Sequence, residues 1–223
     1  MGWDEQWSDP ETLGKWLKPD GRILALARRL REQGAKRAFD LGCGPGRHVV
    51  ALAREGFDTY GCDFSAPAVA YCRRWLAQEG LQAHVVRSDM AELPFGETSF
   101  DLIVAYNVIY HTTYAGMRAL VEELRRRLRP GGWMYATLKG THEHVYGEGE
   151  EIEPNTFLRE SKAVPVHFSK VEEIPDLFGG FQIVDQEVQD YVKQSTQRRH
   201  NILRVTLRKP HPDDGHLSAA RPT

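Results

Sequence analysis

The chain has 223 residues, of which 41% are apolar and 27% charged, and its formal net charge is −2. These values are typical of one globular domain with a substantial core, and they argue against a nucleic-acid surface built on bulk positive charge. No apolar run is long enough to cross a bilayer, so we expect no membrane partner.

The N-terminal segment, residues 1–34, is predicted to be helical. Trp3 and Trp7 are four residues apart, which places them on one face of a helix. These rings either pack this helix onto the core or form a lid over a bound ligand, with Trp7 as a candidate substrate contact. Asp20 then caps a second helix that ends near Gly34.

Residues 37–65 are the most informative part of the chain. A short apolar run leads into a glycine-dense turn, a segment with helical periodicity follows, and a second short run ends in an acid. This order predicts a β-loop-α-β unit that binds a cofactor containing adenosine.

The spacing of the glycines indicates which cofactor this is. The turn contains Gly42, Gly44 and Gly46, whereas a dinucleotide fingerprint would place its third glycine where Arg47 stands. Asp40 precedes the turn, and its charge would repel a pyrophosphate but attract a cationic ligand. Glycines suit a turn that must approach the ligand closely and adopt left-handed dihedrals.

Strand and helix patterns continue to alternate after this unit. Ser65 is expected to cap a helix that has Pro67 in its first turn and ends near Gly80. The run 99–105 is almost continuously apolar, as expected for a parallel strand buried on both faces. The alternation predicts a doubly wound parallel α/β sheet. The further predicted elements are strands at 83–87, 133–138, 181–187 and 202–207 and a helix at 114–128.

The connection 139–170 has no clear period and is rich in aromatic residues and histidine, so we predict a substrate lid. Tyr146 and His167 are its candidate acceptor contacts. Residues 1–209 would then form a single domain, followed by a polar, mobile tail at 210–223. Imidazole and carboxylate groups within the lid could bind a divalent cation, but their pattern is weak and no metal site is predicted. These candidate ligands are His142, His144, Glu148 and His167.

Three acids follow successive predicted strands, at the edge where open α/β sheets bind ligands. Asp63 could accept hydrogen bonds from both hydroxyls of a ribose, and Asp89 with Met90 could meet an adenine. Asn107 follows the next strand, where the reacting group would lie. Any one of these acids could instead be a helix cap or a solvated loop end, but together they suit one ligand.

Five segments in this order resemble the motifs of the small-molecule branch of class I S-adenosylmethionine-dependent methyltransferases. The resemblance implies S-adenosylmethionine as cofactor and a Rossmann-like sheet of seven strands, mostly parallel with an antiparallel last strand, between helices on both faces. The stretch 147–169 resembles, more weakly, tellurite-resistance and thiol methyltransferases. The five segments are 40–46, 61–65, 88–95, 99–104 and 128–132. The cofactor-binding residues implied are Asp40, Gly42, Gly44, Gly46, Asp63, Phe64, Asp89, Met90 and Asn107.

The chemistry follows from such a cofactor. Its sulfonium is a good leaving group, so the protein must align the acceptor, exclude water and remove a proton from a neutral acceptor. His111 is the candidate base, although it could equally be held by hydrogen bonds at a strand end. Tyr110 could orient the acceptor or pack in the core. We therefore expect a methyltransferase for a small molecule; the alternatives are a cofactor-binding module without turnover and a nucleic-acid methyltransferase.

The cysteines and the N-terminus predict a cytoplasmic location. Cys43, Cys62 and Cys72 have neither framework nor ligand spacing, which suggests a reducing compartment. The N-terminus has no basic region followed by an apolar stretch, so no secretory signal is visible.

Overall fold

The computed structural model describes residues 2–93, 95–96, 100–159 and 164–215. Pro94 and Ser99, which belong to the resembling motifs, lie outside these residues. So do residues 160–163 of the predicted lid and residues 216–223 of the predicted tail.

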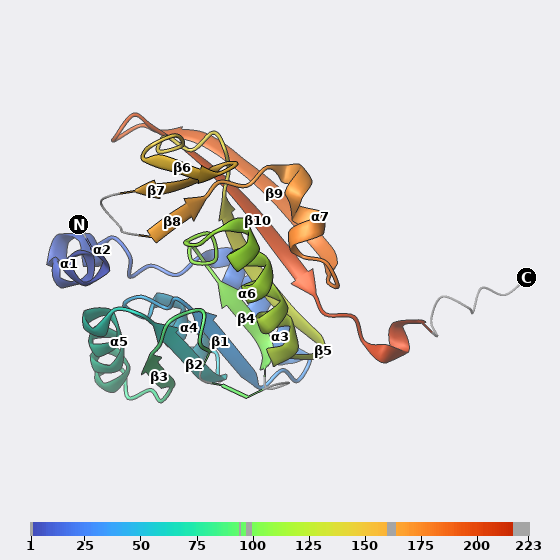
Figure 1. Cartoon of the computed structure of the whole chain (residues 1–223). Helices are drawn as coiled ribbons and strands as arrows, with labels where there is room; N and C mark the ends of the chain where they lie inside the picture. Colours follow the sequence, from blue (N-terminus) through green and yellow to red (C-terminus); the bar gives the residue numbers. More distant parts are fainter. Residues whose placement is uncertain (1, 94, 97–99, 160–163, 216–223) are drawn as a thin grey trace, which may run out of the picture.

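Seven strands form the central sheet: β1 (Arg37–Leu41), β2 (Asp58–Asp63), β3 (His84–Arg87), β4 (Phe100–Ala105), β5 (Leu128–Lys139), β9 (Gln182–Lys193) and β10 (Arg198–Arg208). Their order across the sheet is β3-β2-β1-β4-β5-β10-β9 (Figure 1). The pairs among β1 to β5 are parallel, whereas β10 is antiparallel to both β5 and β9. This topology confirms the predicted sheet with its antiparallel last strand.

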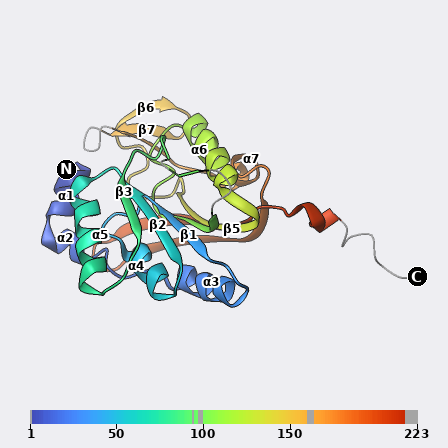
Figure 2. The same cartoon turned by 90° about the horizontal axis from the view of Figure 1, so that it is seen from below.

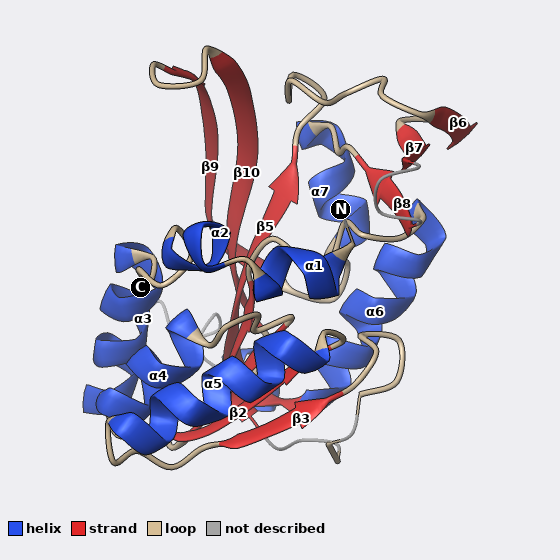
Figure 3. Cartoon of the chain, turned by 90° about the vertical axis from the view of Figure 1, so that its left-hand side faces the viewer, coloured by secondary structure: helices blue, strands red, loops and turns tan. Residues whose placement is uncertain are grey.

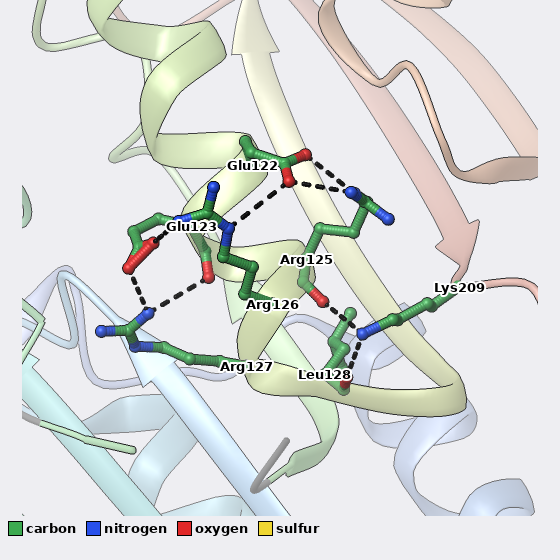
Figure 4. Close-up of polar contacts among 7 residues, drawn as sticks. All are labelled: Glu122, Glu123, Arg125, Arg126, Arg127, Leu128 and Lys209. Carbon is green, nitrogen blue, oxygen red and sulfur yellow. Dashed lines mark hydrogen bonds and ion pairs between the residues drawn. The ribbon is translucent and has the colours of Figure 1, made fainter. Parts of the chain in front are cut away.

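Helices cover both faces of the sheet, as predicted (Figure 2). One face carries α3 (Gly21–Glu32), α4 (Arg47–Arg54) and α5 (Ala66–Gln78), and the other carries α6 (Tyr114–Arg127) and α7 (Ile174–Leu177). The predicted caps are confirmed, because Asp20 accepts a hydrogen bond from the Arg22 amide and Ser65 accepts one from the Ala68 amide. Lys209 donates to the carbonyl oxygens of Arg125 and Leu128 and so holds the chain beyond β10 against the end of α6 (Figure 4).

The connection between β3 and β4 interrupts the alternation of strand and helix, and the sequence predicts no helix there. The described residues of that connection form turns and no helix. Asp89 accepts a hydrogen bond from the Ala91 amide, and its carbonyl accepts one from the Glu92 amide, which closes a turn. Gly96 and Pro94 follow in the sequence, and both residue types disfavour a helix interior.

The predicted irregular connection 139–170 contains a second sheet. Its strands are β6 (Glu150–Glu153), β7 (Thr156–Arg159) and β8 (Val164–His167), paired antiparallel in that order. These strands are four residues long, and Asn155 in the turn between β6 and β7 has a left-handed φ of 59°. Strands this short show too few alternations for a sequence pattern to reveal them. Two short 3-10 helices, η1 (Val171–Glu173) and η2 (Pro212–Gly215), complete the described elements.

The last two strands are longer than predicted. β9 and β10 form a hairpin that projects beyond the other strands of the central sheet (Figure 3). β9 is exposed along most of its length, so its polar residues hide the apolar pattern of a buried strand.

The N-terminal segment forms α1 (Trp3–Ser8) and α2 (Pro10–Gly14), as the tryptophan spacing predicts for its first part. These helices lie above the ends of the parallel strands (Figure 3). Among the described residues, no helix is both long and apolar enough to span a membrane. The cytoplasmic location stays a prediction.

Replacing Gly46 by alanine should destabilise the fold. The residue has φ +98°, and an added Cβ would lie 2.9 Å from the Cβ and 3.3 Å from the Cα of Cys72 in α5. Left-handed strain and overpacking together predict a loss of about 2–5 kcal/mol in unfolding free energy, measured by denaturant titration. Gly80→Ala is the matched control, because Gly80 has φ +65° but an added Cβ meets no atom within 4 Å. We expect a loss of only about 1–2 kcal/mol there, and equal losses would contradict this assignment.

Candidate functional site

A cavity of about 530 Å³ lies at the carboxyl ends of the parallel strands, and residues of α1 line it. Its volume is in the range of sites that hold small ligands, roughly 300–1000 Å³. Residues from the turns after β1 to β5, from α1 and from β7 and β8 line it. The cavity therefore occupies the edge of the sheet at which the sequence predicts ligand binding.

The glycine turn has the conformation that its sequence demands. Gly42, Gly44 and Gly46 have φ angles of 62°, 54° and 98°, all left-handed. Gly42 and Gly44 line the cavity, and a Cβ on Gly44 would lie 3.3 Å from the Trp7 ring. Gly46 does not line the cavity; its lack of a side chain lets α4 begin against Cys72. Two of the three predicted glycines thus line the cavity, and the third allows α4 to pack closely against α5.

Asp40 is buried beside this turn without a matching cation. Its Oδ2 has no hydrogen-bond partner among the described residues, and its Oδ1 lies 3.9 Å from His48 Nδ1. His48 accepts a hydrogen bond from the Asp20 amide through Nε2, and burial together with Arg47 lowers the pKa of His48 to about 3, so the ring is neutral. Burial raises the pKa of Asp40 to about 8, with Arg47 opposing and Asp63 adding to the effect. A cation bound near this turn would favour the charged form of Asp40.

Asp63 ends β2 and lines the cavity. Its Oδ2 accepts a hydrogen bond from the Gly44 amide and its Oδ1 accepts one from the Ser65 amide, both at 2.8 Å. Burial raises its pKa, and these two hydrogen bonds oppose the rise. Each oxygen keeps a further lone pair that could accept a hydroxyl of a ligand. Phe64, which follows, also lines the cavity and is 55% exposed.

The remaining predicted cofactor residues line the cavity as well. Asp89 is exposed, and Met90 packs against the main core from the same turn. Asn107 follows β4 with a left-handed φ of 57°. Its amide donates to Thr137 Oγ1 at 2.8 Å, and the Thr137 hydroxyl donates back to its Oδ1 at 3.1 Å, so β5 fixes this turn.

Aromatic rings close the cavity on the side of β4 and α1. Tyr110 is buried, and burial raises its pKa, so its phenol is neutral. The His111 ring lies edge-on to Trp3 at 4.9 Å between centroids and is tilted against Tyr110 at 4.6 Å. Trp7 is buried and lines the cavity beside the glycine turn. The predicted acceptor residues Tyr110, His111 and Trp7 therefore share one space.

Two predicted acceptor contacts lie elsewhere. Tyr146 is 40% exposed and donates its hydroxyl to Asn155 Oδ1 at 2.8 Å, outside the cavity lining. His167 is buried, with Nδ1 at 2.8 Å from Thr156 Oγ1 and Nε2 at 3.2 Å from Glu173 Oε2. Both side chains make hydrogen bonds in or beside the second sheet instead of facing the cavity. The sequence suggested an open loop here, whereas β7 and β8 are paired strands. We do not retain them as acceptor contacts.

The sequence reasoning missed three basic residues that line the cavity, Arg47, Lys139 and Arg159. The guanidinium of Arg47 lies between the rings of Trp16 and Tyr106, at 5.0 and 4.6 Å from their centroids. Lys139 is the last residue of β5, so the rule that strand ends carry the site could have found it. Arg159 comes from β7, which no sequence pattern announced.

The four residues considered as metal ligands do not converge. Glu148 pairs with Arg159 at 2.5 Å, and His144 instead lies with Glu143 and His200. The Nδ1 atoms of both histidines face Glu143 Oε1, at 2.9 and 3.1 Å. None of these three residues lines the cavity.

Comparison with known proteins agrees with this geometry. A family model described as a methyltransferase domain matches residues 38–132. A solved S-adenosylmethionine-dependent methyltransferase from Methanosarcina mazei superposes with a TM-score of 0.71 at 20% identity, over 87% of this chain and all of that one. Residues 38–132 therefore form a methyltransferase domain, and the chain has the fold of the class I S-adenosylmethionine-dependent methyltransferases.

Other similar proteins differ in their acceptors. The tRNA N(3)-methylcytidine methyltransferase Mettl2 of Drosophila melanogaster is 29% identical over 189 residues, which are 77% of this methyltransferase. This chain spans only 58% of that relative's length. A solved 1,6-didemethyltoxoflavin-N1-methyltransferase of Burkholderia thailandensis, with 1,6-didemethyltoxoflavin and S-adenosylhomocysteine bound, matches with a TM-score of 0.66 at 18% identity, over 92% of this chain and 84% of that one.

The residues present fit S-adenosylmethionine, the cofactor of this methyltransferase family. The cofactor carries an ammonium and a sulfonium, and the unmatched Oδ2 of Asp40 suits positive charge. Asp63 has lone pairs left for the ribose hydroxyls. A pyrophosphate would meet the same two acids, which do not suit it.

Cofactor binding should release a proton from Asp40. At pH 7 this carboxyl is mostly protonated, because its pKa is about 8. A bound cation lowers that pKa, so the affinity should rise as the pH increases towards 8. Calorimetry at pH 7 in buffers of different ionisation enthalpy should count close to one more released proton for the native methyltransferase than for Asp40→Asn. The cofactor's own amino group cancels in this comparison, and equal counts would show that Asp40 does not respond to the cofactor.

Proposed function

We propose that this methyltransferase transfers the methyl group of S-adenosylmethionine to a small-molecule acceptor by in-line displacement. The observation that carries the proposal is that two strand-end acids, Asp63 and Asp89, line one cavity together with the Tyr110–His111 pair. Two glycines of the turn, Gly42 and Gly44, and residues of α1 line the same cavity. A methyl donor and its acceptor must share such a space, because the reacting atoms have to approach within about 3–3.5 Å.

The cofactor half of the cavity follows β1, β2 and β3. The amides of the glycine turn would approach the methionine part, and Asp63 would accept both ribose hydroxyls. Asp89 and Met90 would meet the adenine, with Phe64 against its plane. Arg47 adds a cation suited to the cofactor's carboxylate, beside the acid that suits its ammonium. Asn107 would lie next to the methyl group.

The acceptor half follows β4 and β5. S-adenosylmethionine supplies a methyl group on a positively charged sulfur, so the protein's task is to place the acceptor and exclude water. Trp3 and Trp7 of α1 cover the cavity and suit the second task, which supports the proposed lid in residues 1–34. His111 would take the proton of a neutral acceptor, with its ring oriented by Trp3 and Tyr110.

A tRNA acceptor is the second candidate, because curated relatives from animals are tRNA methyltransferases. The basic residues of α6 do not favour it. Arg125 donates to both carboxylate oxygens of Glu122, Arg127 donates to Glu123, and Arg126 lies between these two acids (Figure 4). Each of these three arginines thus has a carboxylate partner on the same helix, whereas a phosphate-binding surface needs unmatched cations.

Transfer of a labelled methyl group decides between these candidates. Native protein is incubated with methyl-labelled S-adenosylmethionine and either a small-molecule extract or total tRNA, and the labelled products are separated by size. We expect label in the small-molecule fraction only. Label in tRNA would overturn the proposed acceptor class, and no label in either fraction, with cofactor binding intact, would favour a binding module without turnover.

Replacing His111 by asparagine tests the proposed base. Turnover at saturating acceptor should fall by about 10²–10⁴-fold, the usual contribution of general acid–base catalysis. Affinity for S-adenosylhomocysteine, measured by calorimetry, should change little. His84→Asn is the control, because His84 is an exposed residue of β3 outside the cavity. A native rate for His111→Asn would make His111 a structural residue.

A further inference from the structure

Acidic and basic residues lie on opposite sides of this site, separated along the order of the strands in the sheet. Asp40 lies near the end of β1, Asp63 ends β2 and Asp89 follows β3, and these strands form one side of the sheet. Lys139 ends β5, two strands beyond β1 on the other side. Neighbouring strands are about 4.8 Å apart, so these two strand ends are separated by roughly 10 Å. The turn after β4, which carries His111, lies between the acids and Lys139.

Lys139 is a half-buried cation without a counter-ion. Its Nζ lies 5.6 Å from the centre of the Tyr110 ring and 6.0 Å from that of Phe168. Within the described part of the chain, no carboxylate pairs with this ammonium and no group accepts a hydrogen bond from it. Burial lowers the pKa of Lys139, with Glu143 opposing that effect. Two ring faces replace only part of the hydration that the ammonium has lost.

The other basic residues of the cavity are already engaged. Arg159 donates to Glu148 at 2.5 Å. Arg47 stacks between Trp16 and Tyr106 on the cofactor side. Of these three cations, Arg159 has an acid partner and Arg47 lies close to the acids of the cofactor side. Lys139 has neither.

We propose that the methyl acceptor is a small organic anion whose carboxylate or phosphate pairs with the Lys139 ammonium. Its apolar part would lie against Tyr110, Trp3 and Val166, which line the same cavity. The inference rests on the proposed function, because the acceptor must occupy the half of the cavity that the cofactor leaves. An ammonium is a compact charge that pairs with either oxyanion, so the experiment separates the two.

The experiment compares native protein with Lys139→Gln and Lys139→Arg. Lys193→Gln is the matched control, because Lys193 is exposed at the end of β9. Calorimetry first measures S-adenosylhomocysteine, and all four proteins should bind it within about twofold. Benzoate, phenyl phosphate and neutral benzamide are then titrated into the S-adenosylhomocysteine-saturated proteins.

One of the two anions should bind native protein at least tenfold more tightly than benzamide, and the preferred anion identifies the oxyanion. Lys139→Gln should lose this preference, while Lys139→Arg and Lys193→Gln keep most of it. A preference that survives in Lys139→Gln, or native protein that binds benzamide as tightly as the anions, would overturn the inference.

A second measurement separates this inference from the proposed function. Label transferred to a small-molecule extract is fractionated by anion exchange, and we expect the methylated acceptor in the retained fraction, with at least tenfold less product from Lys139→Gln. Label in the unretained fraction at an unchanged rate would overturn the inference while the function stands. Anion binding without label in any fraction would overturn the function alone. Absence of both anion binding and a retained product would overturn the inference.

Discussion

The site depends on a carboxyl group that the fold buries without a partner. Asp40 is the next-to-last residue of β1, in the middle of the sheet, where burial is nearly complete. The histidine beside it is neutral, and the nearest guanidinium, that of Arg47, is held between two aromatic rings. Burying a carboxyl in this way costs free energy, which the protein recovers only when a cation arrives. The left-handed glycines beside Asp40 allow a ligand to approach closely enough for that exchange.

Lys139 lines the cavity on the side of β5 and is the cationic counterpart of Asp40, which is buried beside the glycine turn. Each is a titratable group that would be more stable in water, and each has a lowered tendency to be charged because of burial. Groups of this kind concentrate at functional sites, since a structural role alone would favour a matched pair or an apolar side chain. The two lie too far apart along the strand order to neutralise one another. The free protein therefore has an acidic half that favours a cation and a basic half that favours an anion.

The parts of the fold that could be predicted are those in which local sequence and tertiary burial agree. β1 and β4 are short apolar runs buried on both faces, and α4 follows a turn that only glycines could form. The second sheet could not be predicted, because strands of four residues depend on pairing partners that the sequence does not reveal. The turn between β3 and β4, where the sequence predicts no helix, is stabilised by the hydrogen bond that the Asp89 carboxylate accepts from the Ala91 amide.

The residues of the candidate site likewise include some whose positions the sequence could predict and some whose positions it could not. Every predicted cofactor residue except Asp40 and Gly46 lines the cavity, because the parallel strands of a doubly wound sheet bring their carboxyl ends to one edge. Tyr146 and His167 do not, since their positions depend on the unpredicted second sheet. The cofactor side of the cavity includes a glycine turn whose spacing can be read in the sequence, so the sequence could predict it. The acceptor differs between relatives, and the basic residues on the other side of this cavity, such as Lys139 and Arg159, come from single positions without a shared spacing. In the function that we propose, acceptor choice depends on which charges the fold leaves unmatched, and only the folded chain reveals those.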